Sequence, residues 1–247
     1  MSLPHWLWLL VAGVGGGFTG SVAGLASLVS YPALLAAGLS PVAANVTNTV
    51  ALVFSGAGST WGSRPELSAQ RARARVLAPV AAMGGLAGAL LLVLTPSGYF
   101  TRAVPVLIGL ASLGILLPRG TQERARWLAG PLLAVPVGLV AMYGGYFGAA
   151  SGVVLLAVFS RALDVPLPSA NALKNLLMGL VNLVAGVLFC FVAPVRWADA
   201  VPLAAGFLIG ARVGPVVVRR APPRALRIVI ACAGAGLAVH LGLAAYR

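Results

Sequence analysis

Apolar residues fill this chain almost from end to end, and this constrains its fold more than any other feature. Hydrophobic residues make up 60% of the 247 positions, and charged residues make up only 9%. Glycine, proline and charged residues divide the chain into ten apolar segments. The expected segments are 5–20, 22–38, 42–61, 76–95, 102–117, 128–146, 148–162, 168–192, 199–218 and 225–244. The sequence therefore predicts an all-α polytopic membrane protein without a separate soluble domain.

Short motifs recur between the two halves of the chain at nearly constant spacing. Ala44-Asn45 recurs 126 residues later as Ala170-Asn171. A second set recurs after 124 residues: Gly20, Gly24, Ala26 and Ser27 match Gly144, Gly148, Ala150 and Ser151. A third set recurs after 122 residues: Arg102-Ala103, Ala111 and Gly114 match Arg224-Ala225, Ala233 and Gly236. We therefore expect an N-terminal repeat over 1–120 and a C-terminal repeat over 121–247, within a single membrane domain.

Basic residues gather in three loops, and their positions predict how the repeats are oriented. The groups are Arg64, Arg71, Arg73 and Arg75; Arg119, Arg124 and Arg126; and Arg219, Arg220, Arg224 and Arg227. Loops rich in Lys and Arg stay in the cytoplasm, so each half should cross the membrane an odd number of times. Five crossings per half, or three crossings and one re-entrant pair, both satisfy this condition. The prediction is two inverted-topology repeats in the cell (inner or plasma) membrane, with both termini outside.

Two segments of each half are short and interrupted by glycine. A helix of 15 to 17 residues rises only about 22 to 26 Å, which is less than the 30 Å of a bilayer core. The stretches 20–27 and 144–151 are therefore predicted to be turns near the midplane, with second half-helices that begin near Gly24 and Gly148. The free N–H groups of such helix starts attract anions. Close helix packing through small residues is the alternative interpretation.

Lys174 is the ionisable residue that lies well inside an apolar segment, about 9 Å from the start of segment 168–192. Burying a Lys at such a depth costs about 2.5 to 3.5 kcal/mol, so a partner is expected. The same segment contains no Asp or Glu. An anionic substrate is the partner we favour, and snorkelling of the side chain to the interface is the alternative.

Amide and hydroxyl groups complete the candidate anion site. Asn45 and Asn48 lie three residues apart on one helical face, and Asn171 and Lys174 repeat this spacing. Such groups bind oxyanion oxygens without adding charge. The candidate substrate-binding residues are Gly24, Ser27, Asn45, Thr47, Asn48, Gly148, Ser151, Asn171 and Lys174. The alternatives are polar contacts between helices for each Asn, which suit Asn175 and Asn182 better, and bonds to its own helix for each Ser.

Several classes of function are disfavoured. The acidic residues Glu66, Glu123, Asp164 and Asp199 all fall in predicted loops or at segment ends, which argues against a carboxylate proton relay. No ATP-binding loop is present, and the two His residues lie near the chain ends without a catalytic arrangement. We expect no enzyme activity, cofactor, metal or nucleic acid; the expected partners are the lipid bilayer and a small anion. Gly and Ala stripes would permit a homodimer.

Two groups of motifs carry a family resemblance. The first comprises Tyr31-Pro32-Ala33-Leu34-Leu35, Gly38-Leu39-Ser40-Pro41 and Ala44-Asn45-Val46-Thr47-Asn48. The second comprises Gly145-Tyr146-Phe147-Gly148-Ala149-Ala150-Ser151-Gly152 and Ala170-Asn171-Ala172-Leu173-Lys174-Asn175. Together they resemble the TauE/SafE family of sulfite and sulfonate exporters, also called TSUP permeases. The resemblance implies a secondary transporter of small organic or inorganic sulfur oxyanions such as sulfite, a sulfonate or sulfoacetate, acting in export. A non-transporting membrane assembly or scaffold subunit is the alternative.

Overall fold

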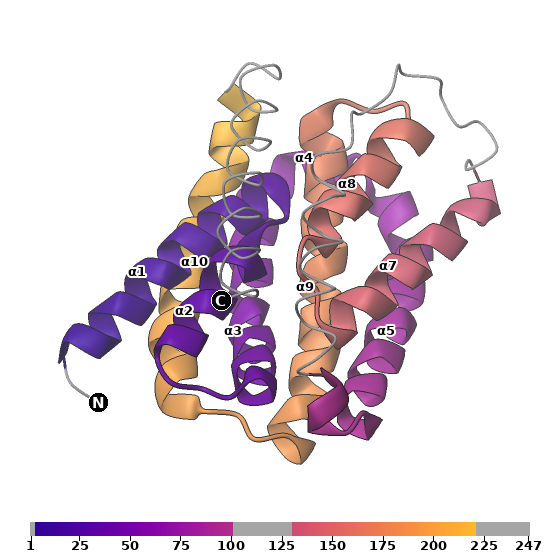
Figure 1. Ribbon diagram of the computed structural model, residues 1–247. Helices are drawn as coiled ribbons and strands as arrows, with labels where there is room; N and C mark the ends of the chain where they lie inside the picture. The colour runs from indigo at the N-terminus through magenta and orange to yellow at the C-terminus, as the bar shows by residue number, and fades with distance from the viewer. Residues whose placement is uncertain (1–2, 101–129, 221–247) are drawn as a thin grey trace.

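The computed structural model describes residues 3–100 and 130–220, which form helices and connecting loops (Figure 1). The first half contains α1 (Leu3–Ala23), α2 (Ala26–Ala36), α3 (Pro41–Gly62), α4 (Arg64–Ser68) and α5 (Arg71–Leu94). The second half contains the short 3-10 helix η2 (Gly130–Leu133), α7 (Ala134–Tyr146), α8 (Ser151–Ala162), α9 (Leu167–Val192) and α10 (Trp197–Arg220). The expected segments 102–117 and 225–244, the second basic loop and the third set of repeat matches lie outside the described residues.

The helix boundaries follow local signals in the sequence. The Ser40 hydroxyl accepts a hydrogen bond from the Ala43 N–H at 3.4 Å, and Pro41 follows as the first residue of α3. Gly38, with φ of +86°, ends the preceding turn of α2. Helices α1, α5, α9 and α10 are long and apolar enough to cross a membrane. All-α architecture with membrane-length helices is thereby confirmed for the described part of the chain.

The first two helices of each half form a broken hairpin. Trp8 Nε1 of α1 donates to Ala33 O of α2 at 3.5 Å, so α2 runs back along α1. Gly24, with φ of +80°, forms the turn between them, and Gly148 with φ of +75° lies between α7 and α8. α2 has 11 residues and α8 has 12, so each rises less than about 20 Å. α2 and α8 are therefore too short to cross a bilayer core of about 30 Å.

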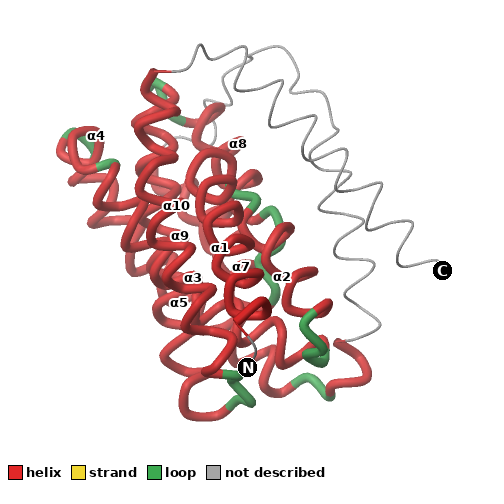
Figure 2. Tube along the Cα trace, turned by 90° about the vertical axis from the view of Figure 1, so that its left-hand side faces the viewer, coloured by secondary structure: helices red, strands yellow, loops and turns green. Residues whose placement is uncertain are grey.

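Helix directions differ between the halves. α1 and α10 run in one direction, because Gly13 and Gly17 of α1 meet Gly206 and Ala211 of α10 in the same order. α3 runs the same way, because its Gly58 and Gly62 meet Leu208 and Pro215 of α10. α5 and α7 are also parallel to each other, while α9 crosses α3 antiparallel. Figure 2 shows these long helices side by side in one bundle. The directions agree with an inverted repeat, which stays a prediction because the last predicted segment of each half is not described.

Small residues allow the close approach of these helices. A Cβ atom on Gly17 would lie 2.5 Å from Phe207 O, and one on Gly84 would lie 2.6 Å from Gly138 O. The first contact joins α1 to α10, and the second joins α5 to α7. Small residues in this fold therefore serve both interpretations given above: some pack helices and others form the breaks.

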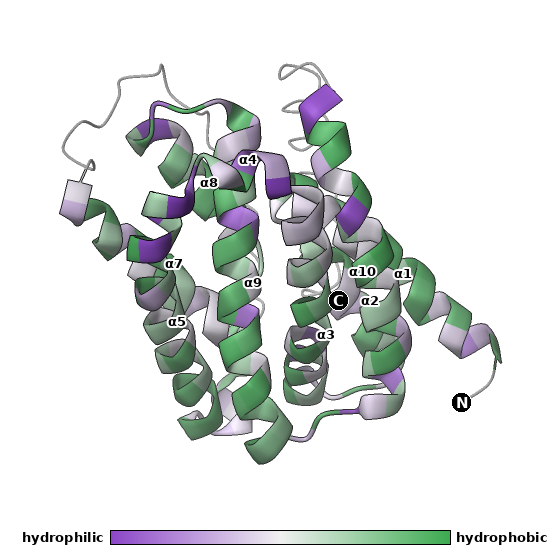
Figure 3. Ribbon diagram, turned by 180° about the vertical axis from the view of Figure 1, so that it is seen from behind, coloured by the Kyte–Doolittle hydropathy of each residue, from purple (hydrophilic) through white to green (hydrophobic). Residues whose placement is uncertain are grey.

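Two of the three basic loops lie on the same face of the bundle. Arg219, near the end of α10, makes a two-pronged ion pair with Glu66 of α4, with N–O distances of 2.6 and 3.1 Å. Its guanidinium also donates to Gly62 O at the end of α3 at 3.1 Å. Hydrophilic residues gather around α4 and the end of α10, whereas hydrophobic residues cover most of the helix lengths (Figure 3). This arrangement agrees with the predicted odd number of crossings per half.

Candidate functional site

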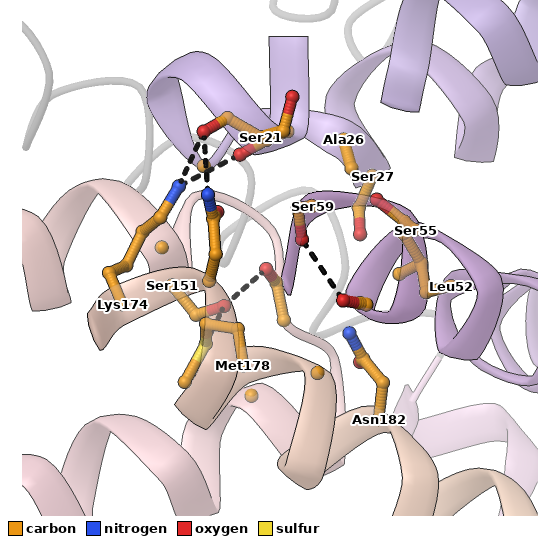
Figure 4. A pocket seen from close by; sticks show the side chains of 18 of the residues that line it. Ser21, Ala26, Ser27, Leu52, Ser55, Ser59, Ser151, Lys174, Met178 and Asn182 are labelled. Carbon is orange, nitrogen blue, oxygen red and sulfur yellow. Dashed lines mark hydrogen bonds between the residues drawn. The ribbon is translucent and has the colours of Figure 1, made fainter. Parts of the chain in front are cut away.

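A small polar cavity lies where the two broken hairpins meet (Figure 4). Its volume is about 60 Å³. Both breaks contribute to its wall through Gly24 and Gly148, and α3 and α9 form the rest. The polar side chains that line it are Ser21, Ser27, Thr49, Ser55, Ser59, Ser151, Lys174, Asn175 and Asn182. Of the predicted site, Gly24, Ser27, Gly148, Ser151 and Lys174 are brought together here.

Lys174 lies in the wall of this cavity and is only 1% exposed. Its Nζ donates to Gly20 O at 2.9 Å and to Ser21 O at 3.3 Å. The alternative of snorkelling is therefore wrong. Both acceptors belong to the last turn of α1, where the helix dipole favours a cation. Among the described residues, no acid pairs with Lys174.

Two helix N-termini also face the cavity. α2 begins at Ala26 and α8 begins at Ser151, and no side chain caps either start. Ala26, Ser27, Ser151 and Gly152 all belong to the cavity wall. Gly24 and Gly152 are in direct backbone contact, so the two hairpin tips touch. The site thus combines one ammonium group with the partial positive charges of two helix starts.

Asn45 and Asn171, the repeated pair, make equivalent hydrogen bonds to the ends of α7 and α1. Asn45 Nδ2 donates to Tyr146 O at the end of α7, and Asn171 Nδ2 donates to Ser21 O in the last turn of α1, both at 2.9 Å. Each amide thus binds the broken helix of the other half. Neither residue lines the cavity. Both Oδ1 atoms are buried without a hydrogen-bond partner among the described residues.

Asn48 and Thr47 also lie behind the cavity wall. The Asn48 Nδ2 donates to Ser27 Oγ at 3.2 Å, and its Oδ1 accepts from the Ser30 hydroxyl at 2.6 Å. Thr47 Oγ1 accepts from the Arg196 N–H at 3.0 Å, which joins α3 to the start of α10. These contacts correspond to the alternative of polar links between helices. Asn48 nevertheless positions the hydroxyl of Ser27, which does line the cavity.

The two predicted serines differ in their hydrogen bonds. The Ser151 hydroxyl donates to Gly148 O at 2.8 Å, as the alternative of bonding to nearby backbone predicts. Ser27 Oγ accepts from Asn48, and its own proton has no acceptor among the residues that the structure describes. Ser27 is therefore the better placed of the two to donate to a ligand.

Six polar residues that line the cavity were not among the predicted site residues. They are Ser21 of α1, Thr49, Ser55 and Ser59 of α3, and Asn175 and Asn182 of α9. Asn175 Nδ2 donates to Ser21 O at 3.1 Å, so its expected linking role is confirmed. The expected linking role of Asn182 is wrong, because its amide faces the cavity without a hydrogen bond to any described residue. Helical spacing could have found it, since Lys174, Met178 and Asn182 lie four residues apart on one face of α9.

A cluster of aromatic side chains packs beside the cavity. Phe147, which lines it, packs edge-on against Tyr31 with ring centroids 5.3 Å apart. Phe100 packs against Phe147 at 5.9 Å and against Tyr146 at 5.7 Å. Phe100 is fully buried and Phe147 is nearly so, so these rings belong to the hydrophobic core beside the cavity.

Comparisons with known proteins agree with this picture. The family described as "Sulfite exporter TauE/SafE" matches residues 9–241. The "Probable membrane transporter protein YfcA" of Escherichia coli strain K12 is 29% identical over 230 residues, which cover 91% of this chain and 85% of that protein. The "Probable membrane transporter protein ORF9" of Sinorhizobium sp. is 24% identical over 237 residues, covering 95% and 91%. No solved structure gives a significant match. Because the family match spans nearly the whole chain, this membrane protein belongs to the TauE/SafE family of transporters.

Proposed function

We propose that this transporter carries a small sulfur oxyanion of the sulfite or sulfonate type, and that it acts in export. The observation that carries the proposal is the meeting of buried Lys174 with the uncapped starts of α2 and α8 around one polar cavity. An anion in this cavity would be attracted by all three groups. The name of the matching family supports the choice of sulfur chemistry.

In this proposal the polar residues divide into two roles. Lys174, Ser27 and the backbone around Gly24, Gly148 and Ser151 contact the anion. Asn45, Asn171 and Asn48 position the helix ends and the Ser27 hydroxyl through the hydrogen bonds described above. Lys174 shares its ammonium between the last turn of α1 and the bound anion, because it lies at hydrogen-bond distance from Gly20 O while lining the cavity.

Export of an anion requires little additional machinery. An inside-negative potential contributes about 2.3 kcal/mol per charge per 100 mV. At 1.36 kcal/mol for each tenfold ratio, this supports roughly a 50-fold gradient of a monovalent anion. We place the protein in the cell (inner or plasma) membrane with its basic face in the cytoplasm and both termini outside, following the positions of Arg64, Arg71 and Arg219.

A scaffold subunit without transport activity is the second candidate. It is favoured by the number of polar side chains that bond backbone groups of other helices, including Asn45, Asn171, Asn175 and Lys174. On this view the cavity is a by-product of helix packing, and the purified protein would show no flux of any anion.

The deciding experiment compares Lys174→Met with Asn175→Ala in liposomes. Both variants remove a donor to Ser21 O, but only the first removes the charge. We expect saturable, potential-dependent uptake of labelled sulfite by the wild type, little change for Asn175→Ala, and loss of uptake for folded Lys174→Met. Unchanged uptake by Lys174→Met would refute the role of Lys174. Absence of flux for every anion tested, with folded wild-type protein, would favour the scaffold.

A further inference from the structure

We infer that Ser55 and Asn182 form a second, uncharged recognition point, which selects short organic anions with a neutral hydrogen-bonding tail. The inference rests on the proposed function. It identifies which part of the substrate the cavity binds in addition to the negatively charged group. Three features carry it: the free hydrogen-bonding groups of the cavity, their position along α3 and α9, and the position of Lys174, the one charged side chain in the described part of the wall.

Most polar groups that line the cavity already make hydrogen bonds within the protein. The hydroxyls of Ser21, Thr49, Ser59 and Ser151 all donate to backbone carbonyls at 2.8 to 3.2 Å. Ser55 and Asn182 differ, because neither makes a hydrogen bond to any residue in the described ranges, although both line the cavity. A polar group inside a membrane bundle without a protein partner is costly. A ligand in the cavity would supply the missing partner.

Ser55 and Asn182 lie on the side of the cavity away from Lys174. Helices α3 and α9 run antiparallel and touch at Gly56 and Gly179. Ser55 and Asn182 are on one side of this contact, whereas Lys174 is on the other. Eight residues separate Lys174 from Asn182, a rise of about 12 Å along α9. Figure 4 shows the side chains of Lys174 and Asn182 on opposite sides of the cavity.

This separation bears on the shape of the ligand. A spherical inorganic oxyanion beside Lys174 would leave Ser55 and Asn182 without a partner. An anion with a short tail can occupy both ends, with its charged group at Lys174 and a hydroxyl or amide at the other end. The cavity of about 60 Å³ limits that tail to a few atoms.

The charge of the lining limits the ligand further. Lys174 is the charged side chain among the described residues that line the cavity, and Ser55 and Asn182 are neutral. In the described part of the wall, a second anionic group on the tail would meet no cation at that end. The amide of Asn182 and the hydroxyl of Ser55 offer both donors and acceptors, which suits an uncharged polar group. The favoured ligand is therefore a monovalent anion with a neutral polar tail.

Two sulfonates of equal charge test this inference. Methanesulfonate has the charged group alone, and 2-hydroxyethanesulfonate adds a hydroxyl on a two-carbon tail. Competition against labelled sulfite in liposomes gives their relative affinities. For the wild type we expect 2-hydroxyethanesulfonate to bind about 5- to 10-fold more tightly, as one or two added hydrogen bonds would produce. Ser55→Ala and Asn182→Ala should each lower this ratio toward one.

Ser59→Ala is the matched control, because Ser59 lines the same cavity but its hydroxyl already donates to Gly56 O at 3.2 Å. This variant should keep the wild-type preference. Equal affinities of the wild type for both sulfonates, or a preference that survives in both Ser55→Ala and Asn182→Ala, would overturn the inference and leave the proposed anion transport intact. Failure of folded wild-type protein to transport sulfite or either sulfonate would overturn both.

Discussion

Adding one methyl group at Gly24 tests whether the two hairpin tips touch at the centre of the protein. Gly24 has φ of +80°, and a Cβ atom there would lie 2.5 Å from both Gly152 Cα and Val153 N. Real Cβ atoms do not approach backbone atoms this closely, and neither backbone segment is a flexible side chain that can turn away. Gly24→Ala must therefore separate α2 from α8 or distort one of the breaks.

The expected loss of stability in Gly24→Ala has two parts, and substitutions at two other glycines measure each part separately. An alanine at positive φ costs about 1 to 2 kcal/mol. Forcing a methyl group into a packed contact typically costs about 1 to 3 kcal/mol. Gly38 has φ of +86° but nothing within 4 Å of its Cβ position, so Gly38→Ala isolates the first part. Gly152 has no positive φ but would meet Gly24 Cα at 2.6 Å, so Gly152→Ala isolates the second.

The measurement is the thermal unfolding midpoint of the three purified variants in one detergent. We expect Gly24→Ala to lose about 2 to 5 kcal/mol, close to the sum of the other two. For soluble chains of this size, each kcal/mol shifts the midpoint by roughly 2 to 4 °C. If Gly24→Ala falls no further than Gly38→Ala and Gly152→Ala matches the wild type, the two tips do not touch and the geometry of the cavity is wrong.

Two further predictions concern helix ends. Asn45→Ala should destabilise the protein more than Asn171→Ala. In the first variant Tyr146 O loses its Asn45 donor, whereas in the second Ser21 O keeps the donors Lys174 and Asn175. Thermal unfolding midpoints that are equal, or lower for Asn171→Ala, would contradict this. Burial alone would raise the pKa of Glu66, but the hydrogen bond and charge of Arg219 outweigh it and lower that pKa below its ordinary value of 4.5. The stabilisation from this pair is therefore present above pH 4.5 and is lost as the pH falls through the lowered value. Since the pair is partly exposed, Glu66→Gln should cost less than about 1 kcal/mol at pH 7, and its difference from the wild type should shrink on acidification in midpoints recorded from pH 7 to pH 3.

Hydropathy predicted the long helices closely because a membrane segment is defined by its own residues. The expected segment 168–192 corresponds to Leu167–Val192, and 42–61 corresponds to Pro41–Gly62. The breaks were also predictable, since Gly24 and Gly148 interrupt apolar runs and adopt positive φ. The five-residue helix α4 was not predicted, because it is shorter than any hydropathy window.

The partners of the polar residues could not be predicted in the same way. Lys174 donates to Gly20 O and Asn45 donates to Tyr146 O, and each contact joins residues more than one hundred positions apart. Their acceptors are backbone carbonyls, which every residue possesses, so no side-chain pattern marks them. The structure is needed to show that these carbonyls lie at the ends of α1 and α7, where carbonyl groups can accept hydrogen bonds from outside the helix.

The repeat-related positions 48 and 174 carry different residues, and of the two only Lys174 places a charged side chain in the cavity wall. Asn48 bonds Ser27 and Ser30 of its own half, whereas Lys174 reaches the end of α1 in the other half. A second Lys at position 48 would add about 2.5 to 3.5 kcal/mol of insertion cost. It would also repel Lys174, because like charges repel more strongly inside a protein than in water. Because no described acid lies beside Lys174 to offset these terms, the repeated frame favours a neutral residue at position 48, where Asn48 bonds Ser27 and Ser30 without adding a second charge.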